Sequence, residues 1–95
     1  MSRKRSNIEI SADILRVALT GAKKSHIVYK ANLNFKIVRK YMDRLRESGL
    51  LAGPTFRDKV YQTTEEGIEY LHRYDEFRDY MQSTGVTPEY ESFVS

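Results

Sequence analysis

The chain contains no cysteine. This absence excludes disulfides and thiolate metal sites, and it is compatible with an intracellular protein. No apolar run approaches the roughly 18 residues that a membrane-spanning helix needs, and residues 1–7 are basic with no apolar stretch behind them. The sequence therefore predicts neither secretion nor membrane insertion. Its 95 residues, 40% hydrophobic and 31% charged, have the balance of one small globular domain.

Catalytic and metal-binding motifs are lacking as well. The two histidines, His26 and His72, are isolated, and the sequence has no glycine-rich phosphate loop and no His-Glu metal pattern. It also has no internal repeat and no low-complexity segment. We therefore expect a protein that is not an enzyme, with no catalytic residues, no metal and no cofactor.

Acidic residues are scarce in the first two thirds of the chain. Residues 1–64 contain 14 Lys and Arg against 5 Asp and Glu, a net charge of +9. Residues 65–95 contain 2 basic and 8 acidic residues, a net charge of −6. A split of this size suggests that the basic part, residues 1–64, faces a polyanion, and that the acidic part, residues 65–95, has a different role. The alternative is two ordinary solvated surfaces.

Capping signals predict where the helices begin and end. Ser6 and Glu9 have capping-box spacing, so we expect a helix from residue 7 to Thr20, closed by Gly21. Its apolar arc is wider than one core contact needs, which implies contact on two sides. The residues of this arc are Ile8, Ile10, Ile14, Leu15, Val17, Ala18 and Leu19.

The rest of the chain predicts three more helices and two short strands. Ser25 is a candidate N-cap for a helix over 26–31, and Asn34 for a helix over 35–48 that ends at Gly49. Strands are expected at 50–53 and 59–63, after which Thr64 caps a helix that runs from Glu65 to about Gln82. The residues expected in the core are Ile14, Leu15, Ala18, Leu33, Val38, Leu45, Leu50, Tyr61 and Leu71.

This order of elements defines a fold class. A short helix, a tight turn and a longer basic helix form a helix-turn-helix, whose second helix enters the DNA major groove. A hairpin directly after it forms a wing. We therefore predict a mainly α fold with a two-stranded β-hairpin, a winged helix-turn-helix over 7–64. A basic arm (1–6) precedes it, and a dimerisation helix (65–82) and a flexible acidic tail (83–95) follow.

Three segments resemble archaeal winged-helix families. Residues 27–34 (IVYKANLN) look like the second helix and turn of small archaeal transcriptional regulators and chromatin proteins. Residues 41–51 (YMDRLRESGLL) resemble the end of the recognition helix with the first wing strand, and 61–67 (YQTTEEG) the second wing strand. Over residues 7–82 the chain is similar to the ten-kilodalton "a" DNA-binding proteins of Sulfolobus. That resemblance implies a dimer joined by an antiparallel coiled coil of long C-terminal helices.

The chain departs from this family at two places. Thr63 stands where Leu is usual, and Gly85 and Pro88 shorten the last helix.

Basic residues at helical and wing positions are candidates for DNA binding, because each cation set against a phosphate releases counterions. Lys36, Arg39 and Lys40 fall in the first turns of the 35–48 helix, from where base edges are reached. Residues 3–5 (RKR) form a mobile arm that reaches a minor groove or follows phosphates. For any single residue, the alternative is a solvated surface charge. The predicted DNA-binding residues are Lys23, Lys24, Lys30, Asn34, Lys36, Arg39, Lys40, Arg46, Arg57 and Lys59.

The last helix carries an aromatic stripe at coiled-coil spacing, which we predict to be a homodimer interface. Ile68 and Leu71 lie on another face, and we expect them to anchor this helix on its own domain. Arg73 and Arg78 are expected to pair across the seam with the surrounding carboxylates. The alternative is that the stripe packs on the first helix of the same chain. The stripe consists of Tyr70, Tyr74, Phe77 and Met81. The acidic residues that surround it are Glu69, Asp75, Glu76 and Asp79.

Together these features predict a cytoplasmic, nucleoid-associated protein that binds double-stranded DNA as a homodimer. It would act as a small archaeal transcriptional regulator or a chromatin-associated protein, with no membrane or metal partner. The alternative is a winged helix used for protein–protein contact without DNA binding, which the 7 tyrosines favour. A salt titration separates the two, because DNA binding weakens steeply with salt.

Overall fold

The computed structural model describes residues 5–85, and in it the predicted helix caps are mostly confirmed. The Ser6 hydroxyl accepts a 3.0 Å hydrogen bond from the Glu9 amide, while the Glu9 carboxylate accepts one of 3.1 Å from the Ser6 amide. The side chains of Asn34 and Thr64 cap the third and fourth helices by accepting from the amides of Ile37 and Gly67, without a reciprocal bond. The elements are α1 (Asn7–Val17), the 3-10 turn η1 (Ala18–Thr20), β1 (Ala22–Lys23), α2 (Lys24–Ala31), α3 (Phe35–Glu47), β2 (Leu51–Ala52), β3 (Val60–Thr63) and α4 (Glu65–Thr84).

The predicted start of α2 is wrong. The helix begins at Lys24, its N-cap is Lys23, and no side chain caps it, so Ser25 lies inside the first turn. The chain enters α2 from extended backbone because Ala22 and Lys23 form β1. At the other end Asn32 takes a left-handed conformation with φ of 58°, which stops the helix before the turn to α3.

The sheet has a strand that the sequence did not predict. Its order is β1-β3-β2, and both pairings are antiparallel. Ala22 lies opposite Tyr61, and Leu51 lies opposite Thr63. The wing expected from the sequence is therefore present with shorter strands, and its central strand β3 is also paired to the segment that precedes α2.

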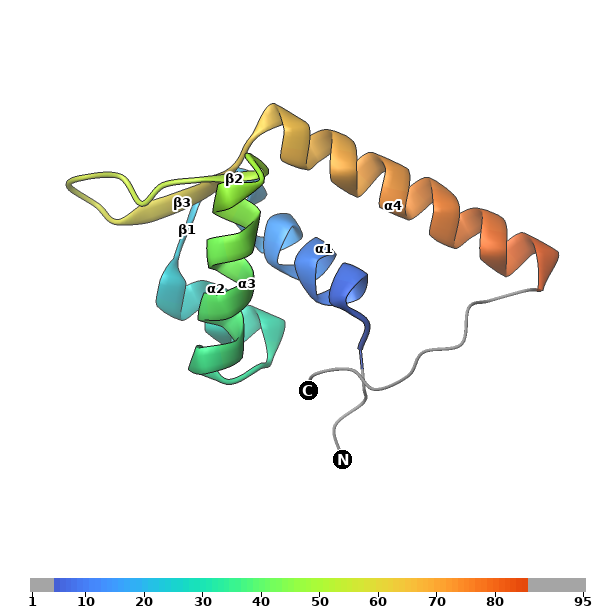
Figure 1. The fold of residues 1–95 in the computed structure, drawn as a ribbon, viewed down its shortest axis with the longest axis horizontal. Helices are drawn as coiled ribbons and strands as arrows, with labels where there is room; N and C mark the ends of the chain where they lie inside the picture. The colour runs from blue at the N-terminus through green and yellow to red at the C-terminus, as the bar shows by residue number, and fades with distance from the viewer. Residues whose placement is uncertain (1–4, 86–95) are drawn as a thin grey trace.

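Helix α1 lies at the centre of the core, as Figure 1 shows, with α2 and α3 on one side and α4 on the other. The predicted contact of its apolar arc on two sides is thus confirmed, except at the two ends of the arc, where Ile8 is 56% and Leu19 is 37% exposed. Leu33 and Leu50 are only half-buried at the edge of the core. The remaining seven predicted core residues are buried, together with Ile10, Ala12, Ala22, Ile27, Ala31, Tyr41, Met42 and Leu51.

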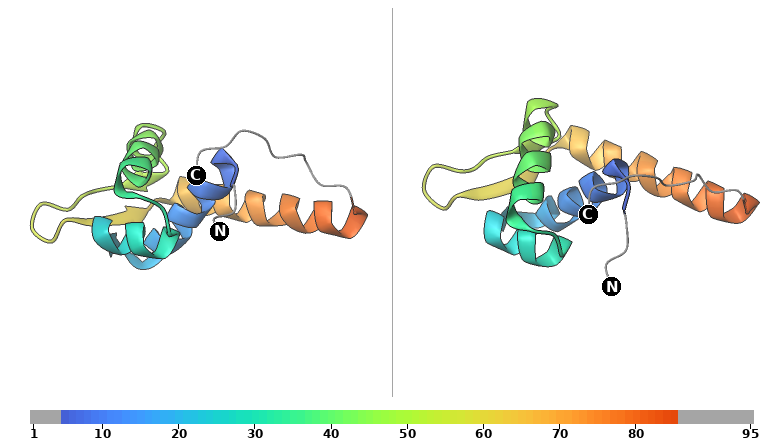
Figure 2. Two further views of the ribbon diagram at one scale, coloured as in Figure 1. Left: turned by 90° about the horizontal axis from the view of Figure 1, so that it is seen from below. Right: turned by 60° about the horizontal axis from the view of Figure 1, so that its bottom comes forward.

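Helix α4 packs on the body mainly through its first half. Leu71 is buried as predicted, but Ile68 is 50% exposed and does not anchor the helix. Tyr70 and Tyr74 pack against the core instead, half-buried. Figure 2 shows the far half of α4 and the wing pointing to opposite sides of the helical body. The helix ends at Thr84 with Gly85 in a left-handed cap, and residues 86–95 of the expected tail lie outside the described part.

Among residues 5–85, no helix combines the length and the hydropathy needed to cross a membrane.

Candidate nucleic-acid interface

Helix α3 presents one face to the core and the opposite face to solvent. Val38, Tyr41, Met42 and Leu45 are buried, because they recur at helical spacing on the inner side. The Asn34 side chain accepts a 2.9 Å hydrogen bond from the Ile37 amide, which fixes the start of the helix. The residues between the buried positions are therefore held outward on a helix that the core positions.

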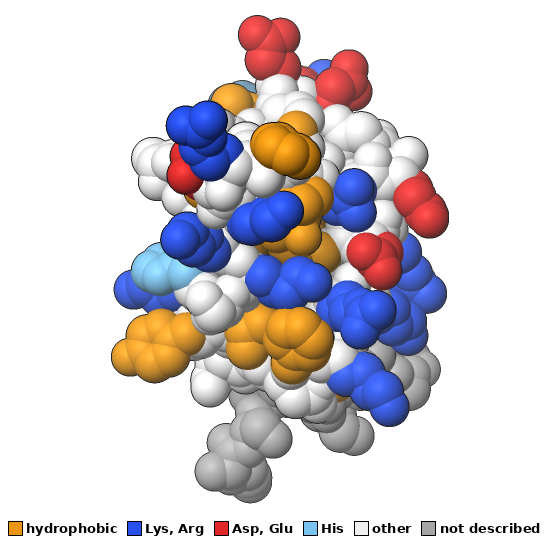
Figure 3. All heavy atoms as spheres, turned by 90° about the vertical axis from the view of Figure 1, so that its left-hand side faces the viewer, with side chains coloured by type: hydrophobic (Ala, Val, Ile, Leu, Met, Phe, Trp, Pro, Cys, Tyr) orange, Lys and Arg blue, Asp and Glu red, His pale blue; other side chains and the backbone are white. Residues whose placement is uncertain are grey.

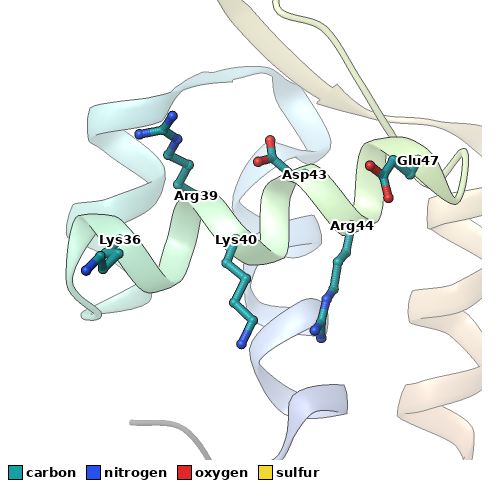
Figure 4. A pocket seen from close by; sticks show the side chains of 6 residues that line it. All are labelled: Lys36, Arg39, Lys40, Asp43, Arg44 and Glu47. Carbon is teal, nitrogen blue, oxygen red and sulfur yellow. The ribbon is translucent and has the colours of Figure 1, made fainter.

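The outer face of α3 carries a shallow hollow of about 440 Å³, shown in Figure 4. Three predicted DNA-binding residues, Lys36, Arg39 and Lys40, line it together. In Figure 4, Lys40 and Arg44 extend to one side of the helix, while Arg39 and Asp43 lie on the other. We call this the α3 hollow, and its lining consists of Lys36, Arg39, Lys40, Asp43, Arg44 and Glu47.

Arg44 is the basic residue that the sequence analysis missed in this hollow. Its guanidinium carbon lies 5.7 Å from the centroid of the Tyr41 ring, a cation–π distance. Position 44 follows Lys36 and Lys40 at steps of four, so helical spacing would have placed it on the same side. The signal was available in the sequence.

Arg46 was predicted at the DNA surface but lies among carboxylates. Its Nη1 is 3.9 Å from Asp43 Oδ1, and the small hollow beside it is lined by Asp43, Arg46 and Glu47. The positive charge of Arg46 is thus partly compensated, unlike the charges of Lys36 and Lys40, which have no acidic partner within ion-pair distance among the described residues.

The predicted cations around α2 lie next to those of α3. Lys23 and Lys30 are exposed, while Lys24 is half-buried with its Nζ 5.2 Å from the centroid of the Phe35 ring. Figure 3 shows Lys and Arg side chains gathered across the middle of this side of the molecule. Acidic side chains lie at its upper end and right-hand edge. One basic surface therefore joins α2, α3 and the wing.

The wing places its two predicted cations on the loop between β2 and β3. Arg57 and Lys59 are both exposed, with Asp58 between them. Three hydrogen bonds close this loop: the Thr55 amide donates to the Val60 carbonyl at 3.0 Å, the Lys59 amide to the Thr55 carbonyl at 3.0 Å, and the Val60 amide to Thr55 Oγ1 at 2.9 Å. The loop thus has internal structure that holds its side chains outward.

Arg5 does not belong to a mobile arm, which corrects the prediction for this residue. Its guanidinium donates hydrogen bonds to Asp13 Oδ2 at 2.7 Å and to the Ala31 carbonyl at 2.8 Å, and its side chain is only 14% exposed. The Ala31 carbonyl is at the C-terminus of α2, where helix carbonyls lack partners and the dipole favours a cation. Arg5 therefore braces α1 against α2. Residues 3 and 4 lie outside the described part.

An ion pair between Arg16 and Asp75 holds α4 against α1. Arg16 donates two hydrogen bonds to Asp75, at 3.2 and 3.0 Å, and these bonds lower the pKa of the Asp75 carboxyl below its ordinary value of 3.8. Burial raises the pKa of Tyr70, although a hydrogen bond with Ser11 opposes the shift.

The arginines of α4 pair within their own helix. The Arg73 Nε donates to Glu69 at 2.7 Å, and Arg78 lies 3.4 Å from Asp75. Arg73 and Arg78 thus each have a carboxylate partner on α4 itself.

The far half of α4 leaves its aromatic side chains largely in solvent. Phe77 is 58% and Tyr80 is 65% exposed, and Met81 is half-buried. The predicted stripe is therefore divided: Tyr70 and Tyr74 contact the core of their own chain, as the alternative interpretation held, whereas Phe77 and Met81 lie beyond it.

Among the residues that the structure describes, no group of three or more His, Asp or Glu side chains is placed to hold a metal ion.

A helix-turn-helix followed directly by a β-hairpin, with a basic outer face on its second helix, defines a winged helix-turn-helix protein. The chain belongs to the winged helix-turn-helix family, whose model matches residues 4–82. It is similar to the DNA-binding protein Sso10a-2 of Sulfolobus solfataricus, with 30% sequence identity over 84% of this chain and 85% of that chain, and a TM-score of 0.76. The resemblance found in the sequence is confirmed.

Two bacterial proteins share the fold at lower identity. BpsR of Bordetella bronchiseptica, whose DNA binding is regulated by 6-hydroxynicotinic acid, is 18% identical with a TM-score of 0.67, over 87% of this chain and 61% of that one. A ZitR variant of Lactococcus lactis, solved in complex with DNA, is 16% identical with a TM-score of 0.65, over 88% of this chain and 63% of that one. A comparison with curated proteins gave no match.

Proposed function

We propose that this protein binds duplex DNA through α3 and the wing, as a homodimer joined by α4, and acts as a small transcriptional regulator or chromatin-associated protein. The observation that carries the proposal is the α3 hollow. Four of its six lining residues, Lys36, Arg39, Lys40 and Arg44, are cations on the outer face of a helix whose inner face is buried. The similarity to Sso10a-2, a DNA-binding protein, supports it.

In this proposal the start of α3 enters the major groove. The cations of the α3 hollow then lie against phosphates and base edges, and the wing follows the neighbouring backbone. Phosphate contacts outnumber base contacts, because six of the nine predicted cations lie outside the first turns of α3. Affinity therefore depends mainly on counterion release.

The test is a salt titration of duplex binding, followed by fluorescence anisotropy. Replacing Arg39→Ala together with Lys40→Ala should weaken binding and lower the slope of log K against log salt by up to about 1.8, since each phosphate contact contributes about 0.9. The matched control is Arg73→Ala with Arg78→Ala, which removes two positive charges from α4. The control should bind as the wild type does.

Unchanged affinity and slope in the Arg39 and Lys40 double variant would reject α3 as the reading element. Absence of duplex binding by the wild type would favour the alternative, a winged helix used for protein contact.

The homodimer is supported by the exposed half of α4. Phe77 and Tyr80 are more than half exposed on a helix that extends beyond its own domain (Figure 1). Aromatic side chains bury large apolar areas, so two such faces can form a useful interface. A two-fold dimer would present two recognition helices to one duplex. We favour the antiparallel arrangement on resemblance to the Sulfolobus proteins. Sedimentation equilibrium at tens of micromolar should give the dimer mass, and a monomer there would reject it.

A further inference from the structure

The side chain of Phe56 is left in water by the fold. It lies on the loop between β2 and β3 and is 94% exposed, the highest value among the exposed large hydrophobic residues described. No core residue contacts it, so folding gains little from its apolar surface. A large aromatic ring in this position therefore indicates a contact with a binding partner rather than a contribution to folding.

The loop presents this ring from ordered backbone. The hydrogen bonds between Thr55 and Val60 and between Lys59 and Thr55 close the loop on either side of Phe56. Lys59 adopts a left-handed φ of 58°, which turns the chain back into β3. The ring thus projects from a closed loop tip, and Figure 1 shows that this tip extends away from the helices.

Cations flank the ring. The Lys59 Nζ lies 5.8 Å from the ring centroid, and Arg57 is exposed beside it, against the single carboxylate of Asp58. An apolar ring bordered by cations matches a slot with an apolar interior and anionic edges. A base step opened from the DNA minor groove has this chemistry, because the faces of stacked bases are apolar and two rows of phosphates border the groove.

We propose that Phe56 inserts between base pairs from the minor groove and bends the duplex. This inference rests on the proposed binding of DNA through α3 and the wing. With α3 in the major groove, the wing reaches the neighbouring minor groove, and an apolar wedge there partly unstacks a base step and kinks the helix axis. Arg57 and Lys59 then lie against the phosphates on either side. The wing would be a DNA-deforming element as well as a backbone contact.

The experiment measures circularisation by DNA ligase of linear duplexes of about 120 base pairs, which are shorter than the persistence length of about 150 base pairs and rarely close unaided. The full-length wild type is compared with Phe56→Ala, with Phe56→Leu, which keeps an apolar wedge, and with Tyr29→Ala. Tyr29 is the matched control, an exposed aromatic residue on α2 rather than on the wing. Fluorescence anisotropy titrations on the same duplexes give the concentration at which each protein occupies the DNA to the same extent, and the circularisation assays are run at these concentrations.

At equal occupancy the wild type, Phe56→Leu and Tyr29→Ala should promote circles, whereas Phe56→Ala should lose about tenfold or more of this activity. The salt slope of Phe56→Ala should stay unchanged, because no charge is removed. Wild-type binding without circularisation, or full circularisation by Phe56→Ala, would overturn the wedge and leave the proposed function standing. Absence of any duplex binding by the wild type would overturn both.

Discussion

The hydroxyl group of Thr63, at the end of β3, donates a 2.6 Å hydrogen bond to the carbonyl oxygen of Leu15 on α1. Thr63 is 5% exposed and is the only buried polar residue in the part of the chain that the structure describes. The family resemblance makes Leu usual at this position, and Leu could not form this bond. The wing strand is therefore tied to the central helix by a polar contact inside the core.

Replacing Thr63→Val keeps the shape of the side chain but removes the donor to Leu15. The buried carbonyl then loses its partner, and we expect the free energy of unfolding to fall by about 1–3 kcal/mol. Urea denaturation followed by circular dichroism measures the change. Thr20→Val, at an exposed position, serves as control and should change stability by less than about 0.5 kcal/mol. Equal stability of both variants would show that the hydrogen bond contributes nothing.

The Arg16–Asp75 pair should make stability depend on pH. Because Arg16 lowers the pKa of Asp75, the contribution is complete above the ordinary value of 3.8 and is lost as the pH falls through the lowered pKa. Both side chains are more than a third exposed, so the pair contributes less than about 1 kcal/mol. A double-mutant cycle of Arg16→Gln and Asp75→Asn measures it at neutral pH. A coupling energy that persisted unchanged at pH 2 would contradict this assignment.

Arg44 and Arg46 should differ as DNA contacts. Arg44→Ala removes a cation from the α3 hollow, so we expect weaker duplex binding and a salt slope reduced by about 0.9. Arg46→Ala should have a smaller effect, because Asp43 lies 3.9 Å away and partly compensates its charge. Anisotropy titrations at several salt concentrations distinguish the two. A larger effect of Arg46→Ala would place the DNA on the Asp43 side of the helix.

A charge at Phe77 should prevent the proposed dimerisation without unfolding the domain. Phe77 is 58% exposed and lies beyond the part of α4 that packs on the core, so Phe77→Asp should leave the helical circular dichroism intact. Sedimentation should then give a monomer. Ile68→Asp is the matched control, since Ile68 is 50% exposed on the opposite face of the same helix and should leave the dimer intact. A dimer with Phe77→Asp would assign the interface to another surface.

Local signals in the sequence predicted the helices well. The caps formed by Ser6, Asn34 and Thr64 each depend on a backbone amide three residues ahead, so the pattern that predicts them is contained in one short segment. The same locality explains why Lys36, Arg39 and Lys40, which lie within five residues of one helix, all line the α3 hollow.

The parts that sequence reasoning missed depend on residues far apart in the chain. Strand β1 exists because Ala22 pairs with Tyr61, and two residues carry no strand pattern of their own. Arg5 reads as part of a basic arm, because its partner at Ala31 is revealed only by the packing of α1 on α2. The prediction for Ile68 was wrong for another reason. Its spacing from Leu71 suggested that both residues anchor α4, but the helix is rotated so that Tyr70 and Tyr74 contact the core instead.

The position of β3 between β1 and β2 bears on how relatives of this chain diverge. The orientation of the hairpin relative to α2 is set by its pairing with residues 22 and 23, which lie outside the hairpin loop. The tip of the loop, residues 56–58, can therefore gain or lose length, or change its side chains, without altering that orientation, as surface loops generally tolerate, whereas Gly53 packs closely against β3. The reach of the wing and the residue at its tip can evolve independently of α3.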